Sequence, residues 1–422
     1  MREQTTNSSV EAAYDDYLMP IWKSLNVPVE RASGCTLEDF DGNEYLDVFS
    51  GISVTNVGHN NEAVVEAATE QLEEFVHGCS YVHPNRPVAD LAETIAEVTP
   101  GDLQKTFFCN SGTEAVEGAI KLARKYTGSK EVISLEMGFH GRTLGTLSLT
   151  KSKEVYTRHY PEVGGVQTIP FCDCESRAAC DCGFFAGGSS RLRDALAPEG
   201  GHVNPDEVAF LVLEPVQGVG GYRFPNEAFI AEVGDVCDSY DIPLVGDEIQ
   251  SGVGRTGEIW AADHYPIEPD VIAAAKGLRV GATISRSEVF PAEKNRLGST
   301  FGGGDLLASM QGALTLEAID EHDLLDNATE RGRQAKEILR DGAPDHVVDV
   351  RGEGLMLAVE FDTADRRDAV VAAALDRGLL TLGCGKKTVR LLPPLDSTER
   401  EIELGAELFC EAMNAVTTDV VA

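Results

Sequence analysis

Residues 107–124 read Phe107-Phe-Cys-Asn-Ser-Gly-Thr-Glu-Ala-Val-Glu-Gly-Ala-Ile-Lys-Leu-Ala-Arg124. The apolar start predicts a short strand, and the small and aliphatic residues that recur after Thr113 predict a helix that ends before Gly128. Ser111 and Gly112 would lie at the positive end of that helix, where backbone N–H groups stabilise an anion. A plain helix N-cap at Ser111 is the alternative.

The same alternation of strand and helix continues through the middle of the chain. The candidate strands are Lys105–Cys109, Glu131–Leu135, Val208–Leu213 and Ile242–Val245. The pattern predicts an α/β fold, with a large domain whose mostly parallel central sheet is wrapped by helices and a smaller α/β domain. We place the large domain at 56–310 and the two segments of the small domain at 1–55 and 311–422.

The composition excludes several classes of protein. The 422 residues carry 70 Asp and Glu against 35 Lys and Arg, a net charge of -35, so nucleic acid and anionic membranes are unsuitable partners. We find no spanning apolar run and no secretory signal, and therefore expect a cytoplasmic protein with reduced cysteines. Acidity spread along the whole chain favours a halophilic protein from a high-salt cytoplasm. An ordinary acidic enzyme from a low-salt cell is the alternative.

Two further motifs bring charge to the ends of candidate strands. An apolar strand delivers Asp247 and Gln250 to its carboxyl end, where open parallel sheets bind ligands. Lys276 is the only charge in Val271–Leu278, and desolvation of a lysine favours a neutral amine that can form a Schiff base. The alternatives are a carboxylate that caps a turn and a lysine that reaches the surface.

Taken together, these motifs resemble the class III aminotransferases of fold type I, such as those acting on 4-aminobutyrate, acetylornithine or ornithine. The resemblance covers nearly the whole chain. It implies transfer of an amino group from an amino acid to an α-keto acid such as 2-oxoglutarate or pyruvate, with pyridoxal 5'-phosphate as cofactor. The motifs, in order, are Glu38-Asp-Phe-Asp-Gly-Asn-Glu-Tyr-Leu-Asp, Gly58-His59, Asn110-Ser-Gly-Thr-Glu-Ala, Phe139-His-Gly-Arg-Thr, Glu214-Pro-Val-Gln-Gly, Asp247-Glu-Ile-Gln, Lys276-Gly, Ser299-Thr-Phe-Gly-Gly and Arg390-Leu-Leu-Pro-Pro-Leu.

The resemblance also implies a role for each cofactor residue. Lys276 would bind the cofactor covalently and then move the substrate proton, and Asp247 would pair with the pyridine nitrogen. Gln250 is expected near the ring hydroxyl, Phe139 on the ring face and Glu214 close by. The phosphate would bind to Ser111, Gly112 and Thr113, with Thr300 supplied by a neighbouring subunit. The active unit would therefore be a homodimer, with a tetramer built from dimers as the alternative.

Three residues of the resemblance concern the substrate. Arg390 would hold the α-carboxylate, Arg142 a second substrate carboxylate, and Ser299 would lie at the substrate site. A guanidinium binds a carboxylate through two parallel hydrogen bonds, although each arginine would also suit a structural ion pair. Many relatives carry a glutamate where this chain has Val219, and that glutamate masks the arginine matching Arg390.

The departure at Val219 leaves the donor open. We expect an ω-amino donor such as 4-aminobutyrate or a diamine-derived amino acid. The alternatives are an α-amino acid or glyoxylate type of aminotransferase, an amino acid racemase, and a metal-stabilised binding protein that has lost catalysis.

Two other motifs lie outside this scheme. The stretch Gly252–Gly257 matches the dinucleotide fingerprint, but the residues after it leave little room for the helix that the fingerprint requires. Cys172, Cys174, Cys180 and Cys182 form a C-x-C-x5-C-x-C pattern, which is compatible with a structural zinc ion or with reduced thiols in a surface insertion. No metal is expected in the chemistry itself.

Overall fold

A seven-stranded sheet forms the centre of the protein in the computed structural model, which describes residues 5–19, 25–299 and 303–416. Its strands follow the order β4-β12-β11-β10-β9-β5-β6, and only β12 among them runs antiparallel to its neighbours. The α/β fold with a mostly parallel sheet is therefore confirmed. The strands span β4 (Lys105–Cys109), β5 (Glu131–Leu135), β6 (Val166–Ile169), β9 (Val208–Leu213), β10 (Leu244–Asp247), β11 (Val271–Ala274) and β12 (Gly281–Ser285).

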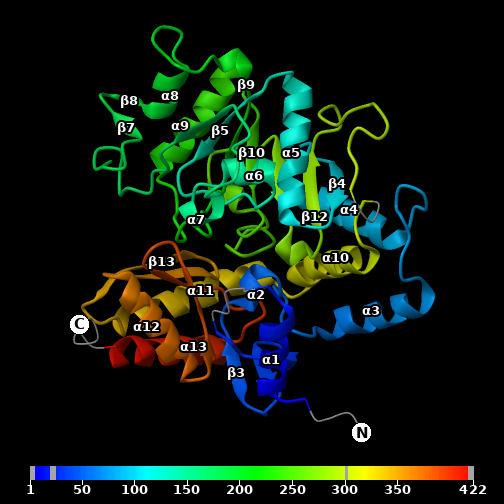
Figure 1. The fold of residues 1–422 in the computed structure, drawn as a ribbon, viewed down its shortest axis with the longest axis vertical. Helices are drawn as coiled ribbons and strands as arrows, with labels where there is room; N and C mark the ends of the chain where they lie inside the picture. Colours follow the sequence, from blue (N-terminus) through cyan, green and yellow to red (C-terminus); the bar gives the residue numbers. More distant parts are fainter. Residues whose placement is uncertain (1–4, 20–24, 300–302, 417–422) are drawn as a thin grey trace.

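The strand and helix first read from the sequence occur as β4 and α5 (Gly112–Thr127), which packs against β11 and β12 (Figure 1). Helix α5 begins at the N-cap Ser111 and ends at Gly128, whose φ of 75° suits a residue without a side chain. Ala115, Val116, Ala119, Ile120 and Ala123 are buried in one hydrophobic cluster with residues of the central strands, as the periodicity predicts.

Two smaller sheets lie beside the central one. The first consists of β13 (Val347–Glu353), β14 (Met356–Phe361), β17 (Thr388–Leu391) and β16 (Leu382–Cys384). In the second, β1 (Val29–Ser33), β2 (Thr36–Asp39) and β3 (Glu44–Asp47) are joined by β15 (Leu379–Leu380), which runs parallel to β3. The N-terminal and C-terminal parts of the chain thus share a sheet.

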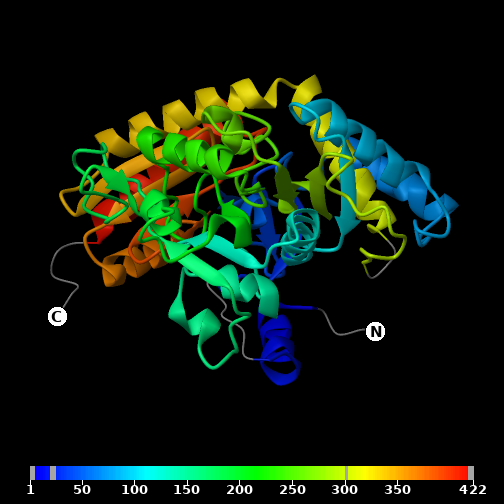
Figure 2. The same ribbon diagram turned by 90° about the horizontal axis from the view of Figure 1, so that it is seen from above.

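Helices α10 (Leu306–Glu321) and α11 (Leu324–Asp341) connect the central sheet with these smaller sheets. Figure 2 shows them in yellow along one side of the molecule, and α10 packs on α4 while α11 packs on β13. The domain boundaries at 55/56 and 310/311 stay a prediction, and the second falls within α10.

The other helices and short strands are α1 (Asn7–Tyr17), α2 (Ser50–Ser53), α3 (Glu62–Glu74), α4 (Arg86–Val98), α6 (Leu144–Leu149), α7 (Glu154–Thr157), β7 (Phe185–Ala186), β8 (Ser189–Ser190), α8 (Arg191–Leu196), α9 (Glu227–Tyr240), α12 (Ala364–Leu375) and α13 (Glu399–Ala415), with 3-10 turns η1 (Pro205–Glu207), η2 (Ala261–His264) and η3 (Lys276–Leu278).

A fully buried arginine ties these parts together. Arg255 donates hydrogen bonds to Ser53 and Asn56 near the N-terminus and to the carbonyl oxygens of Leu355 and Pro393 near the C-terminus. Burial lowers its pKa to about 10. The stretch Gly252–Gly257 around it forms turns that lead into η2, so it lacks the α-helix that a dinucleotide site needs.

No helix in the described ranges is long and apolar enough to cross a membrane.

Candidate active site

A cavity of about 560 Å³ opens at the carboxyl ends of the central strands. Nine of the predicted site residues line it, although they come from five separate segments of the chain. They are Ser111, Gly112, Thr113, Phe139, Arg142, Glu214, Asp247, Gln250 and Lys276. Ser299 lies beside the rim, where its hydroxyl accepts a hydrogen bond from Asn110, whereas Thr300 lies outside the described residues.

Lys276 follows β11 and begins the turn η3, with a backbone φ of 35°. Its side chain is half-buried because it faces the cavity. Desolvation and the nearby charge of Arg390 lower the pKa of its amine to about 7, against the opposing pull of Asp247 and Glu214. A large fraction of this lysine is therefore neutral, and nucleophilic, near neutral pH.

Asp247 ends β10 and is held by a histidine that sequence reasoning assigned no role. His140 Nδ1 lies 2.8 Å from Asp247 Oδ2, and both side chains are buried. Burial opposes protonation of the imidazole, but the Asp247 carboxylate outweighs it and raises the pKa of His140. His140 Nε2 has no hydrogen-bond partner among the described residues. The one sequence feature that could have indicated a role for His140 was its position next to Phe139 in the Phe139-His-Gly-Arg-Thr motif.

Glu214 lies on the same side of the cavity after β9. Its carboxylate accepts hydrogen bonds from the backbone N–H groups of Phe139, at 2.8 Å, and Gly218, at 2.9 Å. Desolvation nevertheless raises its pKa to about 7, so this acid exchanges a proton in the same pH range as Lys276. The cavity thus contains two titrating groups of opposite charge type.

The start of helix α5 forms another wall of the cavity. Ser111 accepts from the N–H of Glu114 at 3.4 Å, and Thr113 Oγ1 lies 2.8 Å from Thr146 Oγ1. A Cβ atom at Gly112 would lie only 2.8 Å from Cδ1 of Ile249. Glycine therefore allows the start of α5 to pack closely against the segment that follows β10. Backbone N–H groups and two hydroxyls are gathered here, which suits an anion.

Arg390, on β17, reaches the cavity residues from the smaller sheet. It is buried, and its Nη1 donates to Gln250 Oε1 at 3.3 Å, an oxygen that also accepts from the Tyr222 hydroxyl at 2.9 Å. In the part of the chain that the structure describes, Arg390 makes no ion pair and its Nε has no hydrogen-bond partner. Buried charges are costly unless they are paired, so this guanidinium is suited to a ligand anion.

Arg142 is exposed at the cavity rim, unlike Arg390. Its guanidinium lies 4.8 Å from the centre of the Tyr156 ring and 5.8 Å from that of Phe139. The Phe139 ring packs edge-on against Tyr156, with centroids 5.6 Å apart. The aromatic pair thus orients a cation at the cavity entrance.

Comparisons with known proteins point to one family. The family model described as "Aminotransferase class-III" matches residues 20–413. An acetylornithine aminotransferase of Methanopyrus kandleri is 40% identical over 406 residues, and the match covers 95% of this chain and 98% of that protein. The acetylornithine aminotransferase of Bacillus subtilis is 37% identical over 385 residues, and the match covers 89% of this chain and 92% of that protein. A lysine aminotransferase from M. tuberculosis, solved in its internal aldimine form, superposes with a TM-score of 0.88 at 28% identity, covering 98% of this chain and 100% of that one.

Proposed function

Because the chain belongs to the class-III aminotransferases, we propose that it moves the terminal amino group of a diamine-derived amino acid, of the ornithine or N-acylornithine kind, to an α-keto acid such as 2-oxoglutarate or pyruvate. The observation that carries the transfer to a keto acid is the buried guanidinium of Arg390, which makes no ion pair within the described residues, together with the lowered pKa of the Lys276 amine. The relatives named as acetylornithine aminotransferases support it over a 4-aminobutyrate-like donor.

Enzymes of this family use pyridoxal 5'-phosphate, and the cavity residues fit that group. An amine with a pKa of about 7, a buried carboxylate and a helix start lie around one cavity. When bound, the cofactor supplies an electron sink for the charge left as a proton leaves the amine-bearing carbon.

We assign the cofactor to side chains on three walls of the cavity. Ser111, Gly112 and Thr113 would bind the phosphate, and Asp247, held in place by His140, would pair with the ring nitrogen. Phe139 would contact the ring face, and Gln250 and Glu214 would line its edge.

Lys276 would carry the proton during the reaction. Its amine, a large fraction of which is neutral near pH 7, would accept a proton from the substrate carbon and return it as the acid. Glu214 has a pKa in the same range, so it would tune the charge around this amine.

The two arginines would select the substrate by its carboxylates. Arg390 would hold the carboxylate of the keto acid, and Arg142 a carboxylate at the cavity rim. Val219 is uncharged, and its carbonyl accepts a hydrogen bond from Gly385 N at 2.9 Å in the turn before β17. With an uncharged residue here, Arg390 would stay accessible to α-carboxylates in both half-reactions.

A homodimer completes the proposal. Large apolar side chains are exposed along and after α3, which suits a surface covered by a second copy. They are Val65, Leu72, Phe75, Val76, Tyr81 and Val82. Light scattering on the eluting protein should give twice the mass of one chain, and a monomer with full activity would contradict the shared site.

A donor panel tests the function. The purified protein in molar KCl is given N-acetylornithine, ornithine, lysine, 4-aminobutyrate or an α-amino acid, with 2-oxoglutarate or pyruvate as acceptor and Lys276→Ala as the control. We expect the highest kcat/KM with N-acetylornithine or ornithine, and semialdehyde formed in step with glutamate or alanine. Activity confined to α-amino donors, or inversion of one enantiomer without an acceptor, would overturn the proposal.

A further inference from the structure

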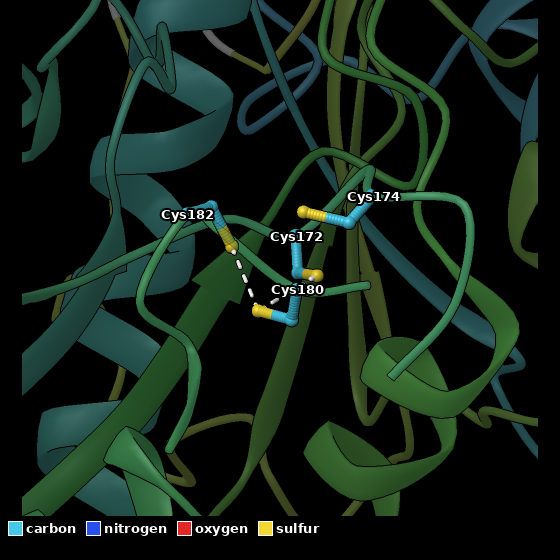
Figure 3. Close-up of side chains that lie close together, drawn as sticks. All are labelled: Cys172, Cys174, Cys180 and Cys182. Carbon is cyan, nitrogen blue, oxygen red and sulfur yellow. Dashed lines mark hydrogen bonds between the residues drawn. The ribbon is translucent and has the colours of Figure 1, made fainter. Parts of the chain in front are cut away.

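Four cysteines between β6 and β7 form a compact group that the aminotransferase reaction does not use. We call Cys172, Cys174, Cys180 and Cys182 the cysteine cluster. Their sulfur atoms all lie within 4.8 Å of one another, and the four side chains converge in Figure 3. Cys172 is buried and the other three are half-buried, and none of them lines the catalytic cavity.

The separations between sulfur atoms match one metal ion rather than a disulfide. Cys172 Sγ lies 3.8 Å from Cys180 Sγ, which lies 3.4 Å from Cys182 Sγ. Four thiolates about 2.3 Å from a central ion occupy the corners of a tetrahedron with edges of about 3.8 Å. A disulfide requires sulfur atoms only about 2.0 Å apart. All four cysteines are free thiols.

The chain around the cysteine cluster holds these thiols in place from outside. Phe171 and Phe184 flank the segment and pack on Phe229, with ring centroids 5.1 and 4.6 Å apart. At the start of α9, Asn226 donates its backbone N–H to the carbonyl of Cys172, at 2.9 Å, and its side-chain amide to that of Cys174, at 2.8 Å. Both ends of the segment are thus fixed on the core of the large sheet.

Between those anchors the segment has little regular structure of its own. It forms bends and turns from Cys174 to Gly183, with no helix or strand. The N–H of Phe185 points to Cys180 Sγ at 3.4 Å, the kind of backbone contact that supports a thiolate ligand. Cys174 Sγ donates a hydrogen bond to Asp181 Oδ1 at 3.3 Å, which holds this thiol at the cysteine cluster. A bound ion would supply the cross-link that this irregular segment lacks.

We propose that the cysteine cluster binds one zinc ion through all four sulfur atoms. Each thiol loses its proton to solvent as its sulfur bonds to the metal, and the oxidation state of zinc and sulfur does not change. With four protein ligands the ion has no open position, so it stabilises the segment and takes no part in the amino transfer.

Metal analysis of the full-length holoenzyme tests this proposal. The protein is purified without chelator and its zinc is measured by mass spectrometry, alongside Cys174→Ser, Cys180→Ser and, as the matched control, Cys410→Ser, a half-buried cysteine outside the cysteine cluster. We expect about one zinc ion per chain in the wild type and the control, and a loss of most of it in the two cluster variants. Cobalt added to metal-stripped wild type should give the absorption bands of a tetrahedral thiolate site.

The change in Tm when the metal is removed distinguishes zinc bound at the cysteine cluster from adventitious zinc. Removing the metal should lower the Tm of the wild type and of Cys410→Ser, and leave that of Cys174→Ser unchanged. Zinc that survives both cluster substitutions, iron in its place, or two fewer titratable thiols caused by a disulfide would each overturn the proposal. So would wild-type protein that neither contains zinc nor takes up cobalt at the cysteine cluster. None of these readouts depends on the amino donor.

Discussion

The catalytic cavity and the cysteine cluster assemble their side chains in opposite ways. The cavity draws on residues from Ser111 to Lys276, with Arg390 reaching in from β17, and each arrives at the end of a different strand or turn. The cysteine cluster draws on Cys172 to Cys182, a run of eleven residues on one segment. The cavity therefore depends on the topology of the whole fold, and the cysteine cluster on local spacing. Substitutions in the cavity should therefore change catalysis, and substitutions in the cysteine cluster should change zinc binding and stability.

The largest separation is expected for Lys276→Ala. Removing the amine that moves the proton should lower kcat by about ten-thousandfold. The Tm and zinc content should stay close to those of the wild type because the side chain faces the cavity. A coupled assay of keto-acid consumption, a thermal melt and metal analysis measure the three quantities. A variant that retains a tenth of the activity would remove Lys276 from the mechanism.

Arg390→Lys and Arg223→Lys form a matched pair, one arginine in each region. Lysine lacks the planar fork that binds a carboxylate, so Arg390→Lys should raise the KM for the keto acid by about ten- to a hundredfold. Arg223 bonds instead to Asp173, next to the cysteine cluster, through contacts of 2.6 and 2.5 Å. Arg223→Lys should lower the Tm and leave that KM unchanged. Equal KM values for both variants would contradict the role of Arg390.

Lys276→Met should reveal the depressed pKa of the lysine as a pH-dependent stability. The pKa of Lys276 in the folded protein is about 7, below the usual 10.5. Above pH 10.5 the lysine is neutral in both the folded and the unfolded chain, and its full contribution to the stability of the fold is present. This contribution is lost as the pH falls through 7, because the unfolded chain binds the proton more readily than the folded one. In protein freed of its cofactor, the stability gained by Lys276→Met should therefore be larger at pH 7 than at pH 10. Urea denaturation at both values measures the difference. An equal gain at both would mean that the lysine is not desolvated.

The smallest effect on catalysis is expected for Cys174→Ser. It removes one ligand of the cysteine cluster and none of the cavity, so kcat at 25 °C should stay within about twofold of the wild type while the Tm falls. Cys410→Ser provides the baseline for both measurements. A large loss of kcat together with an unchanged Tm would link the cysteine cluster to the reaction.

The same contrast explains what the sequence predicted. The unit of β4 and α5 has the predicted bounds because its periodicity and its stop at Gly128 are local signals. Strand β10 begins at Leu244 rather than Ile242, since Pro243 cannot donate to a ladder, and it extends to Asp247, which pairs with β11.

The pairing of His140 with Asp247 left no signal of that kind. These residues are 107 positions apart and meet only because β5 and β10 end at the same edge of the sheet. The net charge is visible in the sequence, but only the contacts around Arg390 show that it makes no ion pair within the described part of the chain. The sequence therefore predicted the chemical character of single motifs, whereas the contacts between motifs depended on the topology of the fold.

Arg255 also bears on how the chain is made. Its guanidinium needs partners from residues 53–56 and from residues 355 and 393, so it cannot be buried with all its hydrogen bonds until the last part of the chain exists. A ribosome would release most of the central sheet before Leu355 and Pro393 emerge. During synthesis this arginine must remain hydrated, and the turns around Gly254 must stay open to water. Completion of the catalytic cavity, which also requires Arg390, is therefore a late event of biosynthesis.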